Sequence, residues 1–178
     1  MNLHDRLQPA LLDRLTDDHR LDPLAAANAD DPQRVMSKQQ IRQAVLRDLS
    51  WLFNAVQPFA ALAARHPRVA GSVLNFGLPP LAGQLASRVD VSVLERSIHE
   101  AITRFEPRIL ADTLQVRAIE WSDLMAAHNI IEFEIRGFLW AQPVPLELLL
   151  RTRLDLEAGQ VTVAEATGTA NSASGARR

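Results

Sequence analysis

The sequence predicts an α+β fold in which N-terminal amphipathic helices pack on a small, mainly antiparallel β-meander. Apolar residues recur every three or four positions up to residue 105, and every second position from residue 114 onward. The first spacing is typical of helices and the second of half-buried strands. Helices that come first and strands that follow indicate the α+β class, and 178 residues suit one domain.

The first long helix is predicted to begin at Ser37, because Ser37 and Gln40 have the spacing of a capping box. Pro58 is expected to end it, since proline lacks the N–H that a continuing helix needs. The amphipathic stripe between these points comprises Ile41, Val45, Leu49, Leu52, Phe53 and Val56.

The second long helix is predicted to open with another capping box, formed by Ser92 and Glu95. Pro107 is expected to end it, because the residue before a proline is disfavoured in the α region. Its apolar stripe comprises Leu94, Ile98, Ala101, Ile102 and Phe105. We expect the aromatic side chains on or beside the two stripes to lie in the core, namely Trp51, Phe53 and Phe105.

Strands are predicted where apolar and polar residues alternate, at 114–118, 131–135 and 148–156. A turn over 157–160 leads into a short returning strand at 161–163. A small meander leaves unpaired edges that can accept a strand from a neighbouring chain. We expect either the 148–156 strand or the 161–163 strand to supply such an accepting edge.

Three regions are predicted along the chain. Residues 1–36 form a leucine-bearing segment followed by an acidic linker, residues 37–165 form the α+β domain, and residues 166–178 form a disordered tail. Within the domain, the glycine- and proline-rich stretch 59–89 is predicted to consist of short helical turns joined by ordered loops.

The composition excludes several functional classes. The 19 basic and 21 acidic residues give a net charge of −2, which argues against a broad nucleic-acid surface. Without cysteine there is no disulfide framework and no thiolate site. No apolar run reaches the roughly 18–20 residues that span a bilayer, and the N-terminus lacks the pattern of a signal peptide. We expect a soluble, cytoplasmic protein that does not insert into a membrane.

No motif in the sequence predicts catalysis, a metal or a cofactor. His99 and Glu100 begin like the zinc-protease helix motif, but Thr103 stands where the second histidine is needed. No glycine-rich phosphate loop is present. Glu106 is the best single candidate for a glycosidase acid, yet among 21 acids a pair at the required separation arises by chance.

The tripeptide Glu106-Pro107-Arg108 stands out. In an extended segment, the carboxylate and the guanidinium would lie side by side, held by the fixed φ of proline. One reading is a local helix stop with two solvated charges, which contribute little to stability. The other is a rigid charged fork that engages a complementary pair on another chain.

Four motifs in order resemble the TssE family, the type VI secretion baseplate subunits related to a phage-tail baseplate wedge protein once labelled lysozyme-like. They are residues 11–15 (LLDRL), 47–54 (RDLSWLFN), 72–79 (SVLNFGLP) and 106–108 (EPR). The resemblance covers roughly residues 10 to 165. Ala55 departs from the family pattern, in which a threonine commonly follows the asparagine.

This resemblance implies a non-catalytic structural subunit that acts in the cytoplasm, at a baseplate docked on the inner membrane. The implied partners are the baseplate proteins TssF, TssG and TssK and the sheath proteins TssB and TssC. Glu106 and Arg108 are then contact residues in wedge assembly, and Pro107 fixes their geometry. The other motifs supply further partner-binding candidates: Arg47, Asp48, Asn75 and Phe76.

Two alternatives stay open. The lysozyme-like label of the phage relative suggests a peptidoglycan-cleaving enzyme. The same fold class also contains a small anti-adaptor of bacterial proteolysis, which suggests a regulatory binding protein. Each alternative predicts different behaviour in a binding or activity assay.

Overall fold

The computed structural model describes residues 11–15, 37–59, 62, 65–81, 89–119, 129–141 and 144–166. Helices come first and strands follow, which confirms the α+β class. The predicted acidic linker and the predicted C-terminal tail lie outside the described residues, apart from Ala166. The described elements are α1 (Leu11–Leu15), α3 (Lys38–Asn54), α5 (Pro67–Ala70), η2 (Val73–Asn75), α6 (Val91–Phe105), η4 (Ala111–Thr113), β1 (Gln115–Ala118), β2 (Ile130–Leu139), β3 (Leu146–Asp155) and β4 (Gln160–Glu165).

The four strands form an antiparallel sheet in the order β1-β2-β3-β4, which is a meander. Strand β3 is therefore paired on both sides, with β2 and with β4. The expectation that the 148–156 strand supplies an accepting edge is wrong, because its N–H and C=O groups are already used by its two neighbours. Of the two strands considered, only β4 lies at an edge.

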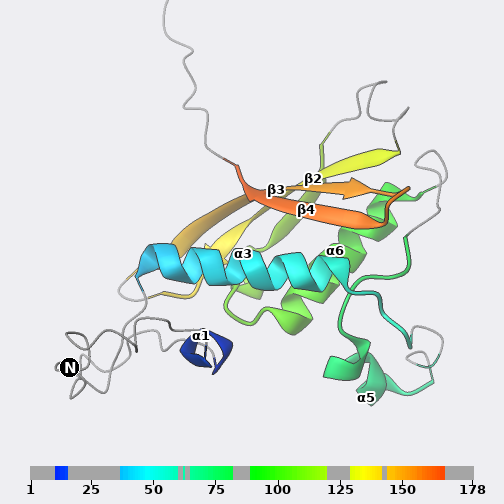
Figure 1. Cartoon of the computed structure of the whole chain (residues 1–178), viewed down its shortest axis with the longest axis horizontal. Helices are drawn as coiled ribbons and strands as arrows, with labels where there is room; N and C mark the ends of the chain where they lie inside the picture. The colour runs from blue at the N-terminus through cyan, green and yellow to red at the C-terminus, as the bar shows by residue number, and fades with distance from the viewer. Residues whose placement is uncertain are drawn as a thin grey trace, which may run out of the picture.

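Helices α3 and α6 cover one face of this sheet, and no described helix covers the other face, called the open face below (Figure 1). Helix α3 lies against β4, α6 lies against β1, and the two helices contact each other. Burial alternates along β2 and β3, so that every second side chain enters the core. The side chains that are almost completely buried include Val45, Leu49, Leu52, Ile102, Phe133, Ile135, Leu139, Leu150 and Leu156.

The two long helices begin differently. At α3, Ser37 and Gln40 form the predicted capping box: the Gln40 N–H donates to Ser37 Oγ (3.2 Å) and the Ser37 N–H donates to Gln40 Oε1 (2.8 Å). The prediction for α6 is wrong, because Asp90 is its N-cap and accepts from the N–H groups of Ser92 and Val93. The Asp90 carboxylate is a stronger acceptor than the Ser92 hydroxyl. The pKa of Asp90 is lowered chiefly by the hydrogen bond from the Ser92 side chain.

Helix α3 also ends earlier than predicted, at Asn54 rather than near Pro58. Ala55 is extended, and the chain from there pairs with a segment about twenty residues further on through a parallel bridge between Val56 and Leu78. The Leu78 N–H donates to the Ala55 carbonyl at 2.9 Å. Tertiary pairing, and not the proline, therefore ends the helix.

The core prediction for the aromatic residues holds for two of the three. Phe53 is buried, and Phe105 is half-buried, with its ring edge-on to Phe76 at a centroid distance of 5.3 Å. Trp51 is 53 % exposed, so its assignment to the core is wrong. Its ring lies under the Arg47 guanidinium, 5.3 Å from the ring centre, in a cation–π contact.

Gly77 makes the bridge at Val56 possible, and we expect Gly77→Ala to destabilise the fold strongly. Its φ is +126°, and an added Cβ would lie 2.3 Å from the Ala55 carbonyl oxygen. Strain and the clash together should lower the free energy of unfolding by about 3 kcal/mol. Gly71→Ala is the matched control, because its nearest contact would be 4.0 Å away. Urea unfolding followed by circular dichroism measures both, and equal midpoints for the two variants would contradict this account.

Candidate functional site: the buried Glu106-Arg108 cluster

Glu106 is the C-cap of α6, and its N–H still donates to the Ile102 carbonyl at 2.8 Å. Pro107 has no N–H and cannot continue the helix, so the chain turns, and the Ile109 N–H donates back to the Glu106 carbonyl at 3.1 Å. This turn directs the Glu106 side chain inward. Its side chain is only 4 % exposed, although it carries a carboxylate.

Arg108 satisfies that buried carboxylate from two residues further on. Its Nε donates to Glu106 Oε1 at 2.7 Å and its terminal nitrogen to Oε2 at 2.5 Å. The Arg108 backbone N–H adds a third bond to Oε1 at 3.2 Å. The predicted pairing of carboxylate and guanidinium is confirmed, but a turn brings them together, so the predicted extended geometry is wrong.

The same guanidinium also pairs with Asp48, which lies on α3 and 60 residues away in sequence. Arg108 thus joins the end of α6 to the middle of α3. Burial by itself lowers the pKa of Arg108, but the hydrogen bond and charge of Glu106, and then those of Asp48, outweigh it and raise the pKa. The guanidinium is therefore a permanent cation shared by two carboxylates.

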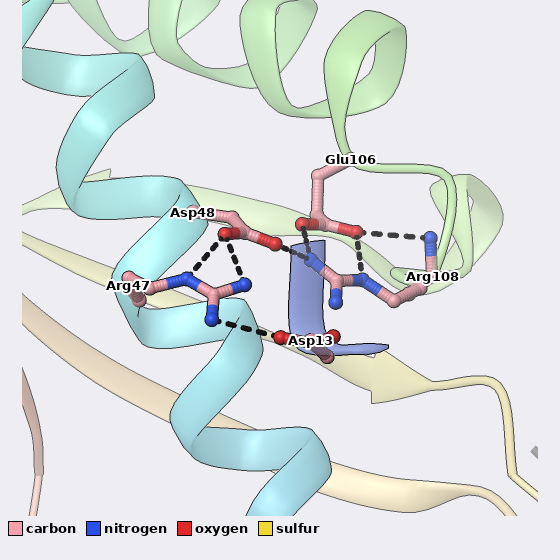
Figure 2. A network of polar contacts seen from close by, with 5 residues as sticks. All are labelled: Asp13, Arg47, Asp48, Glu106 and Arg108. Carbon is pink, nitrogen blue, oxygen red and sulfur yellow. Dashed lines mark hydrogen bonds and ion pairs between the residues drawn. The ribbon is translucent and has the colours of Figure 1, made fainter. Parts of the chain in front are cut away.

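Arg47 extends the cluster to the N-terminal helix α1. Its Nε donates to Asp48 at 2.9 Å, and a terminal nitrogen lies 2.8 Å from Asp13. Burial lowers the pKa of Arg47, but the bonds to Asp13 and Asp48 raise it overall. Figure 2 shows the resulting chain of alternating charges, which runs Asp13, Arg47, Asp48, Arg108, Glu106 and draws on three separate segments.

Backbone hydrogen bonds fix the turn against the sheet as well. The Trp140 N–H donates to the Arg108 carbonyl and the Leu110 N–H donates to the Phe138 carbonyl, at 2.8 and 2.9 Å. Ile109 forms an antiparallel bridge with Leu139, at the end of β2. The cluster is therefore held by α1, α3, α6 and β2 together, which makes it rigid.

Asn75 and Phe76 do not join this cluster. Asn75 is 2 % exposed, and its Nδ2 donates weakly to the Ala70 carbonyl at 3.5 Å. Phe76 packs against Phe105, one residue before Glu106. The surface of this turn is formed instead by Val73 and Leu74, which are 80 % and 65 % exposed.

At each edge of the sheet, a strand residue is hydrogen-bonded to a helix side chain. On β1, the Ala118 N–H donates to Glu95 Oε1 at 2.6 Å. On β4, the Val161 N–H donates to Asn54 Oδ1 at 2.9 Å, and Asn54 Nδ2 donates to the Val161 carbonyl at 2.8 Å. Beyond Val161, no hydrogen bond reaches the outer edge of β4 within the described part of the chain.

Within the described segments, no group of three His, Asp or Glu side chains could hold a metal ion. None of the helices described is long and apolar enough to cross a membrane. A shallow pocket of about 150 Å³ on the open face of the sheet is lined by Gln115, Arg117, Glu134 and Arg136. It is smaller than the roughly 300–1,000 Å³ of ordinary small-molecule sites.

Residues 39–144 match the family described as baseplate wedge protein gp25. The chain belongs to this family. The match confirms the resemblance to baseplate wedge proteins, and three of the four motifs lie within it, at 47–54, 72–79 and 106–108. No curated protein and no solved structure matches the chain.

Membership of the gp25 family gives this chain a structural role in a baseplate, in contact with other baseplate proteins. Two residues of this gp25-family subunit were not predicted as site residues: Asp13, which belongs to the ion cluster, and Asn54, which is bonded to Val161 at the edge of β4. Asp13 is the acidic residue of the 11–15 motif, and Asn54 ends the 47–54 motif. Their positions in those motifs are the only signals that could have found them, because both act on segments distant in sequence.

We expect Arg108→Lys to destabilise this gp25-family subunit by about 1–3 kcal/mol, because one ammonium group cannot replace a bidentate bond to Glu106 and a bond to Asp48. Arg136→Lys is the matched control. Arg136 also pairs with a glutamate two residues earlier, at 2.7 Å from Glu134, but its side chain is 60 % exposed.

The control pair should contribute less than about 1 kcal/mol, because water solvates both charges. Chemical unfolding of the two variants measures the difference between a buried and an exposed pair of the same spacing. Equal losses would show that burial of Glu106 and Arg108 adds nothing.

Proposed function

We propose that this chain is a TssE-type subunit of a type VI secretion baseplate, without catalytic activity. It assembles the wedge with TssF and TssG, near TssK, and it receives the first strands of the TssB–TssC sheath. Its place is the cytoplasmic baseplate at the inner membrane. The observation that carries the proposal is the buried ion cluster at the tripeptide 106–108, inside the region that matches the gp25 family.

The proposed wedge contact uses the parts of the cluster that remain at the surface. Glu106 is buried, so it acts by holding Arg108, and Pro107 is exposed at the tip of the turn. Arg47, Asp48 and Arg108 each keep between 26 % and 31 % of their side chains exposed. A partner therefore meets a fixed surface of alternating charge, which favours specific pairing because little ordering is needed on binding.

The second proposed contact is the turn at 72–79. Asn75 and Phe76 are buried or half-buried, and they position Val73 and Leu74 at the surface. The Arg104 side chain supports the turn by donating to the Ala70 carbonyl at 2.9 Å. In this proposal Asn75 and Phe76 contribute to binding through the two exposed apolar side chains.

The geometry of Glu106 argues against a peptidoglycan-cleaving enzyme. A glycosidase acid must reach the glycosidic oxygen, and its partner carboxylate must face the same bond. Both oxygens of Glu106 accept from Arg108, and the side chain is almost fully buried. The neighbouring Asp48 is occupied by Arg47 and Arg108.

Capture of TssF and TssG by the tagged chain tests the wedge proposal. We expect the wild type and Arg136→Lys to capture both proteins. Arg108→Lys should capture at least about tenfold less of each, since the bidentate bond to Glu106 positions the charged surface. Circular dichroism at the assay temperature confirms that both variants are folded. Equal capture by Arg108→Lys would contradict a role of the fork in assembly.

The same preparations separate the alternatives. Capture of a response-regulator-like adaptor without TssF or TssG would favour the anti-adaptor reading. Turnover of peptidoglycan by the wild type that is lost in Glu106→Gln would favour the enzyme.

The sheath proposal depends on the outer edge of β4. Val163→Pro should abolish sheath nucleation, because it removes an outward N–H donor without removing a bond to β3. Val163→Thr, which keeps the N–H and the branched shape, is the control and should nucleate normally. Sheath tubes counted by electron microscopy give the readout, and tubes in normal number with Val163→Pro would exclude this edge.

A further inference from the structure

The Asn54 side chain behaves like a strand residue at the outer edge of β4. It accepts from the Val161 N–H and donates to the Val161 carbonyl, at 2.9 and 2.8 Å. Its Nδ2 also donates to the Ser50 carbonyl at 2.8 Å, which fixes the amide on α3. A side-chain amide offers the same donor and acceptor as a peptide group, so it occupies the place of one residue of an added strand.

The ladder register shows what remains free. The Ala166 N–H donates to the Leu149 carbonyl of β3, whereas Val161 is bonded to Asn54 on the opposite side. The N–H and C=O groups alternate in direction along an antiparallel strand. The backbone groups of residues 160, 162 and 164 therefore also point toward β3. The backbone groups of Val163 and Glu165 then point outward, and within the described residues they form no hydrogen bond on that side.

We propose that Asn54 is an edge stop that sets the register of the incoming strand. A strand added to β4 pairs with Val163 and Glu165 and cannot extend to Val161, where the amide already fills the edge. This inference rests on the proposed acceptance of a strand at β4, and it adds where that strand must end.

The two faces of β4 define the chemistry of the added strand. Val163 packs against the core, so the strand position beside it is apolar, whereas Glu165 on the same face is exposed. On the open face the corresponding β4 residues are small, Thr162 and Ala164, and they lie opposite Arg153 and Arg151 of β3. These two arginines are exposed, and Glu132 and Glu134 of β2 lie opposite them on the same face. Glu134 pairs with Arg136 instead, and within the described residues neither Arg151 nor Arg153 forms an ion pair.

An acidic side chain on the added strand can reach across the small β4 residues toward those guanidiniums, which favours oppositely charged neighbours on one face. The occupant is therefore an extended segment in which apolar and acidic residues alternate. The β1 edge is a poorer acceptor, because Glu95 takes the Ala118 N–H and α6 lies against that strand.

Amide hydrogen exchange of the free protein tests the stop itself. The Val161 amide should be protected in the wild type, while those of Val163 and Glu165 exchange freely. Asn54→Ala should raise the Val161 exchange rate by roughly tenfold, since the bond that protects it is lost. Ser50→Ala, which leaves the Asn54 amide in place, is the control. An unchanged Val161 rate in Asn54→Ala would overturn the stop.

Cross-linking tests the register, and the absence of cysteine from the chain makes it clean. Ala164→Cys is combined with a hexapeptide of alternating glutamate and valine that carries one cysteine at each position in turn. We expect one dominant cross-linked position in the wild-type background and at least two in Asn54→Ala. The same pattern in both backgrounds would overturn the proposal, and a lysine–valine peptide that binds equally would overturn the acidic preference.

Hydrogen exchange with the purified TssB–TssC complex distinguishes the edge stop from the proposed sheath partner. Protection that the sheath complex adds at Val163 and Glu165, with no change at Val161, supports the edge stop and the sheath as partner. Protection with the peptide and none with the sheath complex would keep the edge stop and reject the sheath as partner. A strand that pairs past Val163 in the wild type, or no pairing with either probe, would overturn the edge stop.

Discussion

One guanidinium, that of Arg108, joins the parts of the molecule on which the candidate site depends. It bonds to Glu106 at the end of α6 and to Asp48 on α3, while its backbone carbonyl accepts from Trp140 after β2. Desolvation offsets much of the attraction within a buried pair, so such a pair contributes more to a fixed arrangement than to net stability. Loss of Arg108 would leave the buried Glu106 carboxylate without a compensating charge, so the arrangement depends on both partners.

Besides packing against one face of the sheet, the two long helices form hydrogen bonds to its edge strands through polar side chains. Asn54 of α3 fills the edge of β4 at Val161, and Glu95 of α6 accepts from β1 at Ala118. Unpaired edges promote uncontrolled association, and proteins limit them by covering or shortening them. Among the described residues the cover on β4 is incomplete, so the same helix that protects the edge at Val161 leaves Val163 and Glu165 uncovered.

The fold was largely predictable because its signals are local. Apolar spacing placed both long helices and all four strands, and the box at Ser37 marked the start of α3 correctly. The errors arose where a distant segment intervened. Asp90 rather than Ser92 begins α6, the bridge between Val56 and Leu78 ends α3 before Pro58, and β4 pairing makes β3 an interior strand.

The sequence by itself determined the α+β class, the tripeptide at 106–108 and the gp25 family, since periodicity and motif spacing are properties of neighbouring residues. Only the tertiary structure decided what those residues touch. Asp48 meets Arg108 across 60 residues and Asn54 meets Val161 across 107. Such contacts depend on how α3 packs against the sheet and on the turn after α6. Burial of Glu106 and exposure of Trp51 follow from that packing, which local sequence does not encode.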